Sequence, residues 1–143
     1  MSEHEAFDAI VDAAPKKKRK KAVSTAARTL AECRKRGWTA GTVEKWNPHV
    51  RIRQDLFGCI DIIALTADGI LAIQSCAGSG HSDHAKKILA EPRAKKWIEA
   101  GGRFEVWSWA KRGERGKQKL WTLRVEDVAP ALRAFNDTQE GAA

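Results

Sequence analysis

The stretch DLFGCIDIIALTADGILAIQSC, from Asp55 to Cys76, decides the fold, because it predicts two short apolar strands joined by a turn at Asp68-Gly69. Such strands are expected in the core of a sheet. Yet Asp61 stands in the middle of the first strand, and the second strand ends in the polar triplet Gln74-Ser75-Cys76. Because burying an unpaired carboxylate costs free energy, this pattern favours a functional site over simple packing.

Further elements lie on both sides of this stretch. A helical pattern runs from Ser24 to Gly37, and WTAGTVEKW predicts one strand that stops at Asn47-Pro48. After the loop AGSGHS, a helix is expected over residues 83–100, with Pro92 starting a new turn or kinking it. The segments RFEVWSWAK and QKLWTLRV flank RGERG and predict a hairpin. One face of a C-terminal helix is expected to hold Val125, Val128, Leu132 and Phe135.

These elements predict an α/β (α+β) domain in which helices cover a mixed sheet. Their order is helix, three strands, helix and strand, followed by an extra C-terminal strand and helix. At 143 residues, with 43% hydrophobic content, the chain is long enough for one domain with an ordinary core. We expect this domain at residues 23–136, after a disordered basic tail at 1–22 and before a frayed end at 137–143.

Composition restricts the class of protein. No apolar run approaches the roughly 20 residues that cross a bilayer, so no membrane partner is expected. The start MSEHEAFDAIVDAA is acidic, unlike a secretory signal, and three cysteines are an odd number for a disulfide framework. The sequence therefore predicts a cytoplasmic protein.

Charge indicates the partner. A net charge of +8 and a pI near 9.7 favour a polyanion, with DNA expected and RNA left open. Beyond the tail, the candidate contacts are Arg51, Arg53, Ser79 and Lys87, of which Ser79 belongs to a loop that suits a phosphate or is only a flexible turn. Six tail residues are expected to contact phosphates or to act as a nuclear-import signal: Lys16, Lys17, Lys18, Arg19, Lys20 and Lys21.

A family resemblance follows from the order of elements and motifs. A helix ending in RKRGW, a strand, a hairpin with Asp61 on its first strand and a polar triplet on its second, and then a helix together resemble the PD-(D/E)XK nuclease superfamily. More narrowly, residues 24–110 look like archaeal Holliday-junction resolvases and small phage proteins of that fold. The resemblance implies a restriction-endonuclease-like core and a metal-dependent DNA endonuclease, acting on branched or recombining DNA. A homodimer is left open, because resolvases act as symmetric dimers.

The resemblance also implies roles for single residues. In the family, an Asp and the Glu of an E-x-K triplet bind magnesium, and the Lys helps to activate the attacking water. Asp61 takes the Asp position, Gln74 the Glu position and Cys76 the Lys position, so Q-S-C replaces E-x-K. Mg²⁺ or Mn²⁺ prefers oxygen ligands, which the Gln74 amide and the Ser75 backbone carbonyl can offer, and Asp55 supplies a second carboxylate.

The triplet lacks a cation, because the Cys76 thiol is mostly neutral at ordinary pH. We expect Lys86, or Lys87 beside it, to open the next helix and to reach back over the strand end. His81 and His84 are alternatives for proton transfer. The expected catalytic residues are therefore Asp61, Gln74, Lys86 and Asp55.

Structural interpretations of the same residues stay open. A buried Asp61 is also satisfied by backbone N–H groups or by Arg53, and Asp55 by a turn. The spacing C-x4-H-x2-H from Cys76 offers zinc ligands, although it is looser than most structural zinc sites. Glu32 fits an ion-pair row with Arg28 and Arg36. Base stacking competes with sheet packing for Trp107, Trp109 and Trp121.

Two other functions compete with the nuclease. A nuclease-fold protein with a degenerate triplet would bind nucleic acid without cleaving it. A protein–protein adaptor explains the basic charge least well.

Overall fold

The computed structural model describes residues 22–140, with the side chains of residues 22–135. The basic residues Lys16–Lys21 of the expected tail lie outside the described residues, as do residues 141–143. Within the described residues, no helix is both long and apolar enough to cross a membrane.

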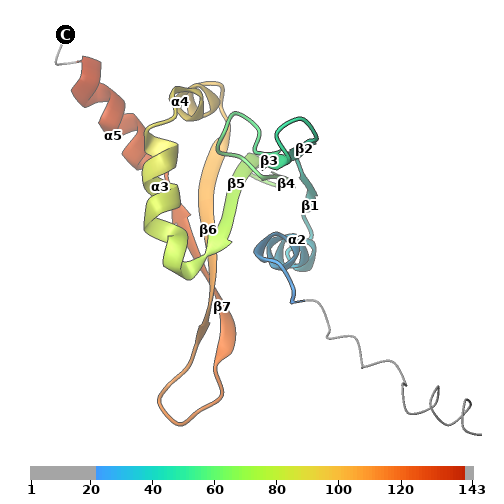
Figure 1. The fold of residues 1–143 in the computed structure, drawn as a ribbon. Coiled ribbons are helices and arrows are strands. Elements are labelled where there is room, and N and C mark those ends of the chain that lie inside the picture. Colours follow the sequence, from blue (N-terminus) through green and yellow to red (C-terminus); the bar gives the residue numbers. More distant parts are fainter. Residues whose placement is uncertain (1–21, 141–143) are drawn as a thin grey trace, which may run out of the picture.

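Five strands form one mixed sheet in the order β1-β4-β5-β6-β7 (Figure 1). Three of them, β1, β4 and β5, form an antiparallel meander, β5 and β6 run parallel, and β6 and β7 are antiparallel. The bounds are Thr39–Thr42 for β1, Ile62–Thr66 for β4, Gly69–Ala77 for β5, Arg103–Arg112 for β6 and Leu120–Asp127 for β7. The α/β (α+β) class and the mixed sheet are thus confirmed.

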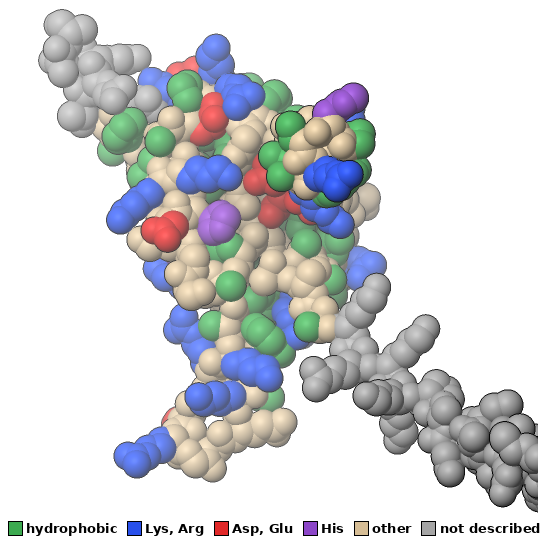
Figure 2. All heavy atoms as spheres, in the orientation of Figure 1, with side chains coloured by type: hydrophobic (Ala, Val, Ile, Leu, Met, Phe, Trp, Pro, Cys, Tyr) green, Lys and Arg blue, Asp and Glu red, His purple; other side chains and the backbone are tan. Residues whose placement is uncertain are grey.

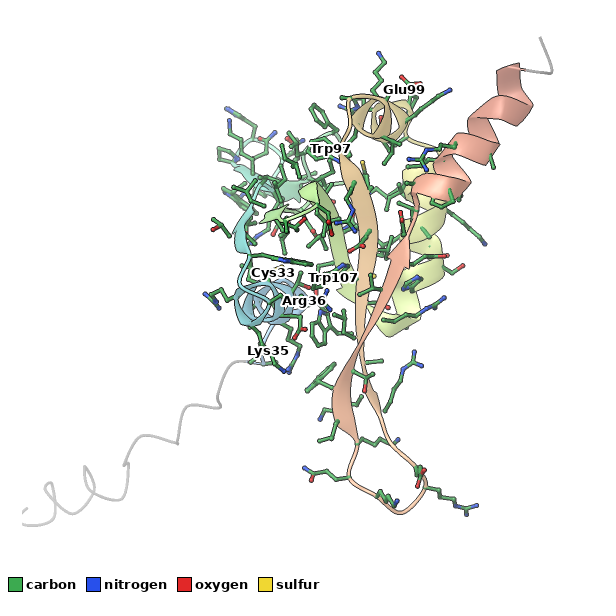
Figure 3. The ribbon with its side chains drawn as sticks, turned by 180° about the vertical axis from the view of Figure 1, so that it is seen from behind. Cys33, Lys35, Arg36, Trp97, Glu99 and Trp107 are labelled. Carbon is green, nitrogen blue, oxygen red and sulfur yellow. The ribbon has the colours of Figure 1, made fainter. Side chains whose placement is uncertain are left out.

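Helices cover both faces of this sheet (Figure 1). One face packs against α2 (Thr25–Lys35), and the other packs against α3 (His81–Leu89), α4 (Pro92–Glu99) and α5 (Ala129–Glu140). The α2 face has a core that includes Cys33, Ile73 and Trp107, and Figure 3 shows Cys33 and Arg36 of α2 beside Trp107 of β6. A second core lies under α3, α4 and α5 and includes Cys76, Ile88 and Phe104.

The local signals that the sequence carries are found at these element ends. The Ser24 side chain accepts a hydrogen bond from the Ala27 N–H at 3.1 Å and caps α2, whereas Gly37 ends it with a φ of 81°. Between β4 and β5, Gly69 has a φ of 117°, and Thr66 bonds to both sides of the turn. The α2 helix and the β4–β5 hairpin are confirmed.

The structure differs from four expectations about the bounds of elements. The segment WTAGTVEKW forms β1 and then β2 (Lys45–Asn47), and β2 pairs with an unexpected β3 (Ile52–Gln54) in a separate hairpin. The helix expected over 83–100 is two helices, because Glu91 caps a new helix that begins at Pro92. Val125 belongs to β7 rather than to the last helix. That helix, α5, continues to Glu140, beyond the domain boundary expected at 136.

Candidate active site at the start of β4

Asp61 lies directly before β4 rather than within a strand, and its side chain is buried. The Asp61 N–H donates to the Ile73 carbonyl at 3.3 Å, and the Asp61 carbonyl accepts from the Val43 N–H at 2.9 Å. The β4–β5 ladder ends at the Ile62–Ile73 pair. The carboxylate therefore stands where β5 continues beyond its antiparallel partner.

Two neighbouring residues of β5 hold the Asp61 carboxylate. The Ser75 N–H lies 3.1 Å from both carboxylate oxygens, and Gln74 Nε2 donates to Oδ2 at 3.2 Å. Arg53 was the other expected partner, but its guanidinium bonds to Glu44 at 3.1 Å. A backbone N–H thus contributes to satisfying Asp61, as one interpretation expected, and the expectation of an Arg53 pair is wrong.

Burial raises the pKa of the Asp61 carboxyl from 3.8 to about 7. The Ser75 N–H partly offsets this effect, because it stabilises the charged form, and the negative charges of Asp55 and Glu44 add to it. Asp55 and Glu44 thus both act electrostatically on Asp61, and we call these three residues the acidic centre. Glu44 was not a sequence candidate. It lies between β1 and β2, in the part of the chain that the unexpected hairpin brings to the site.

Gln74 is 3% exposed, and its Oε1 has no hydrogen-bond partner among the described residues. Its amide nitrogen is already directed at Asp61. A buried carbonyl oxygen that lacks a donor costs free energy, which a bound water molecule or a cation would offset. This oxygen can serve as a metal ligand beside the Asp61 carboxylate.

Ser75 is fixed in place by a buried hydrogen-bond network. Its Oγ lies 2.8 Å from Thr29 Oγ1 of α2, which also accepts from Trp109 Nε1 at 2.9 Å. The N–H and C=O of one residue in an extended strand point to the same edge, so the Ser75 carbonyl is directed toward the edge that Asp61 occupies. Thr29 and Trp109 position this part of the site, although neither was a candidate for such a role.

Cys76 lies on the same strand face as Gln74 and is buried in the core under α3. Burial, reinforced by the negative charge of Asp61, raises the pKa of the Cys76 thiol to about 11. The side chain at the Lys position of the expected triplet is therefore a neutral thiol near the carboxylate. Cys33, Cys59 and Cys76 are all free and buried.

The basic residues nearest the acidic centre differ from those expected. Lys86 and Lys87 lie in the last turn of α3 rather than at its start. Lys87 Nζ lies 4.0 Å from Asp55 Oδ2, whereas the side chain of Lys86, the expected catalytic cation, is exposed and forms no ion pair with the described residues. An open cavity of about 450 Å³ adjoins this pair and is lined by Arg53, Gln54, Asp55, Phe57, Gly58, Lys87 and Arg93.

His81 does not join the acidic centre, and the buried His84 Nδ1 has no hydrogen-bond partner among the described residues. His81 Nδ1 lies 2.6 Å from Ser108 Oγ, and Nε2 lies 2.8 Å from Glu126 Oε2, so both ring nitrogens are engaged elsewhere. In residues 22–135 no three His, Cys, Asp or Glu side chains come close enough to hold a metal ion, which leaves the zinc interpretation without a ligand set. A magnesium ion at Asp61 would depend on the Gln74 and Ser75 oxygens as well.

The remaining candidates divide between surface and core. Arg51 and Ser79 are exposed, and Glu32 pairs with Arg36 at 3.1 Å. Trp107 and Trp109 are buried, as sheet packing requires. Trp121 is 44% exposed and lies under the Arg28 guanidinium at 4.0 Å.

Comparison with known proteins finds no relative of this chain. The chain matches no protein-family model, no curated protein and no solved structure.

Proposed function

We propose that this protein is a metal-dependent endonuclease that hydrolyses phosphodiester bonds in DNA, with Asp61 at the centre of its site. One observation carries the proposal. The buried Asp61 carboxylate contacts the Gln74 amide, whose Oε1 has no hydrogen-bond partner among the described residues. Oxygen groups with unused acceptor capacity suit a hard cation such as Mg²⁺ or Mn²⁺.

The proposed ligands are the Asp61 carboxylate, Gln74 Oε1, the Ser75 carbonyl and the Asp55 carboxylate. A bound magnesium ion lowers the pKa of a water molecule and stabilises charge on a phosphate. Glu44 adds negative charge at the same place, which strengthens the attraction for a cation.

Basic residues line the cavity beside the acidic centre and would bind the phosphate groups of the substrate. Figure 2 shows acidic side chains gathered at the base of the β2–β3 hairpin, with basic side chains around them. Arg53, Lys87 and Arg93 line the cavity next to Asp55. They would hold the phosphate of the substrate against the metal, and Lys87 would replace the cation that the Q-S-C triplet lacks.

A second function remains a candidate because of Cys76. The buried thiol supplies no positive charge beside Asp61, as an enzyme of the resembled family would need. A protein that binds nucleic acid at the same site without cleaving it fits this observation.

Cleavage assays with Lys87→Gln are expected to separate the two functions. The natural protein should cut DNA in Mg²⁺ or Mn²⁺ but not in EDTA, and Lys87→Gln should cut about 10- to 100-fold more slowly, because one cation at the phosphate is lost. The substrates are supercoiled plasmid, a four-way junction and single-stranded DNA. Lys86→Gln, which removes the same charge one residue away, is the matched control and should stay within about threefold of the natural protein.

Tight binding without cleavage of any substrate in either metal would favour the non-catalytic function. Equal losses in the two lysine variants would contradict the assignment of Lys87.

A further inference from the structure

The hairpin of β6 and β7 extends beyond the rest of the sheet (Figure 1). Pairing of β5 with β6 ends at Ala77–Trp109, whereas β6 and β7 continue to pair with each other as far as Arg112–Leu120. Residues 113–119 close the hairpin. We call residues 110–122 the basic arm, and all of its residues from 111 onward are exposed.

The arm accounts for most of the net positive charge of residues 22–143. Residues 22–143 carry a net charge of +6, and the five basic and one acidic side chains of the arm account for +4 of it. Figure 2 shows basic side chains along the arm and at its tip. The basic residues are Lys111, Arg112, Arg115, Lys117 and Lys119.

The base of the arm is braced from two sides. On one side, a Cβ at Gly78, in the 3-10 turn η1 (Gly78–Gly80), would lie 2.8 Å from the Ala110 side chain, so this turn packs directly on the arm. On the other side, Arg28 of α2 stacks on Trp121. Near the tip, a Cβ at Gly113 would lie 2.8 Å from the Gln118 carbonyl, so only glycine lets the two strands approach there. The arm is therefore held in one orientation relative to the sheet.

We propose that the basic arm enters the major groove of duplex DNA. This groove, about 12 Å wide, admits a two-stranded β-ribbon, and the basic side chains at the end of β6 and in the closing loop would contact the phosphates at its rims. The deep, narrow major groove of an RNA duplex excludes such an element, so DNA is the partner. The choice of a nucleic acid rests on the proposed function.

The arm also lies at a suitable distance from the acidic centre. Gln74 pairs in register with Val106, and Arg112 is six residues further along β6, which corresponds to about 20 Å. One turn of duplex spans about 34 Å. A duplex with its backbone at Asp61 therefore reaches the arm within one turn, and the arm would set the position of the cut.

Charge neutralisation in the arm tests this proposal. A triple variant, Arg112→Gln, Arg115→Gln and Lys119→Gln, is compared with a control triple, Lys35→Gln, Lys96→Gln and Arg133→Gln, whose residues are exposed on α2, α4 and α5. Binding of a 30-base-pair DNA duplex is measured in EDTA between 50 and 300 mM salt. We expect the arm triple to bind at least about tenfold more weakly and to reduce the salt slope by about 2.7, and the control to keep the natural slope.

Several results would overturn the proposal. If the two triple variants lose equal DNA affinity, the loss comes from net charge and not from the arm. If an RNA duplex of the same sequence binds as tightly as DNA, the assignment of the arm to the major groove is wrong. If the natural protein sediments as a dimer and the arm triple as a monomer, with unchanged DNA affinity, the arm forms a contact between subunits. Binding is measured without metal, so it does not depend on cleavage. If the arm triple binds DNA more weakly but the natural protein never cleaves DNA, the proposal for the arm is supported and only the proposed nuclease function is wrong.

Discussion

Replacing Asp61 with Asn is expected to abolish metal-dependent cleavage and to make the metal-free protein more stable at pH 8 than the natural chain. Asn keeps the shape of the side chain and an acceptor for the Ser75 N–H, but it removes the buried charge. Loss of the main anionic ligand should lower cleavage at least about 10²- to 10³-fold. Stability should move in the opposite direction, since the charge is costly to bury.

The sign of the pH dependence follows from the raised pKa of Asp61. Folding raises the pKa of this carboxyl from 3.8 to about 7, so the folded state binds more protons than the unfolded chain between these two pH values. The contribution of Asp61 to the free energy of unfolding is therefore fully present below pH 3.8 and is lost as the pH rises through 7. The difference between the two pKa values sets an upper bound of about 4 kcal/mol.

Urea unfolding in EDTA at pH 4 and pH 8 measures this effect. Asp61→Asn should exceed the natural protein by about 2–4 kcal/mol at pH 8 and by little at pH 4. Asp68→Asn is the matched control, because Asp68 is an exposed turn residue, and it should show no such change. Added Mg²⁺ should stabilise the natural protein and not Asp61→Asn. The natural protein and Asp61→Asn could instead be equally stable at pH 8, with no effect of Mg²⁺ on either. That result would contradict the assignment of Asp61 to the metal site.

The double substitution Gln74→Glu and Cys76→Lys is expected to raise Mg²⁺-dependent cleavage at least about tenfold over the natural protein. Gln74 Nε2 is 3.2 Å from Asp61 Oδ2, so Glu at this position places a second carboxylate against the first. Two carboxylates at that distance do not both ionise unless a cation is bound beside them. The variant site should therefore bind Mg²⁺ more tightly than the natural site does. Lys at position 76 adds a positive charge where the thiol already senses Asp61.

The single variants separate these contributions. Gln74→Glu alone should melt at a lower temperature than the natural protein in EDTA at pH 8 and should recover in Mg²⁺. Cys76→Lys alone should gain less activity, because it adds a cation to an apolar core without a new anionic ligand. Gln118→Glu makes the same chemical change as Gln74→Glu in the exposed loop of the arm, away from the acidic centre, and should leave the melting temperature unchanged both in EDTA and in Mg²⁺. A double variant that folds and binds DNA, but gains neither cleavage nor Mg²⁺-dependent stability, would show that Q-S-C is not at a nuclease site.

The central part of the fold was predictable because its signals are local. The apolar runs on both sides of Asp68-Gly69 predict β4 and β5, and the cap at Ser24 predicts the start of α2. Each of these signals depends only on residues close together in the sequence. The β2–β3 hairpin was missed because β3 and most of β2 are exposed and lack apolar alternation. With it, sequence reasoning also missed Glu44.

The site was predictable only where it is formed by the β4–β5 hairpin. Asp61, Gln74 and Ser75 follow from one hairpin, but the Thr29–Ser75 and Trp109–Thr29 bonds join residues 46 and 80 positions apart. The choice between Lys86 and Lys87 depends on where α3 begins, because each residue turns the side chain by about 100° around the helix. No pattern in the sequence fixes that rotation.

The hydrogen bond from Ser75 to Asp61 has a spectroscopic consequence. Its donor is a backbone amide and its acceptor is a carboxylate instead of a strand carbonyl, so the amide proton senses whether that carboxylate is charged, protonated or bound to a cation. In a ¹H–¹⁵N spectrum the Ser75 resonance should move downfield as Asp61 ionises and should shift again when Mg²⁺ is added. The protein thus contains its own nuclear magnetic resonance probe of the state of its acidic centre, readable without substrate and without any substitution.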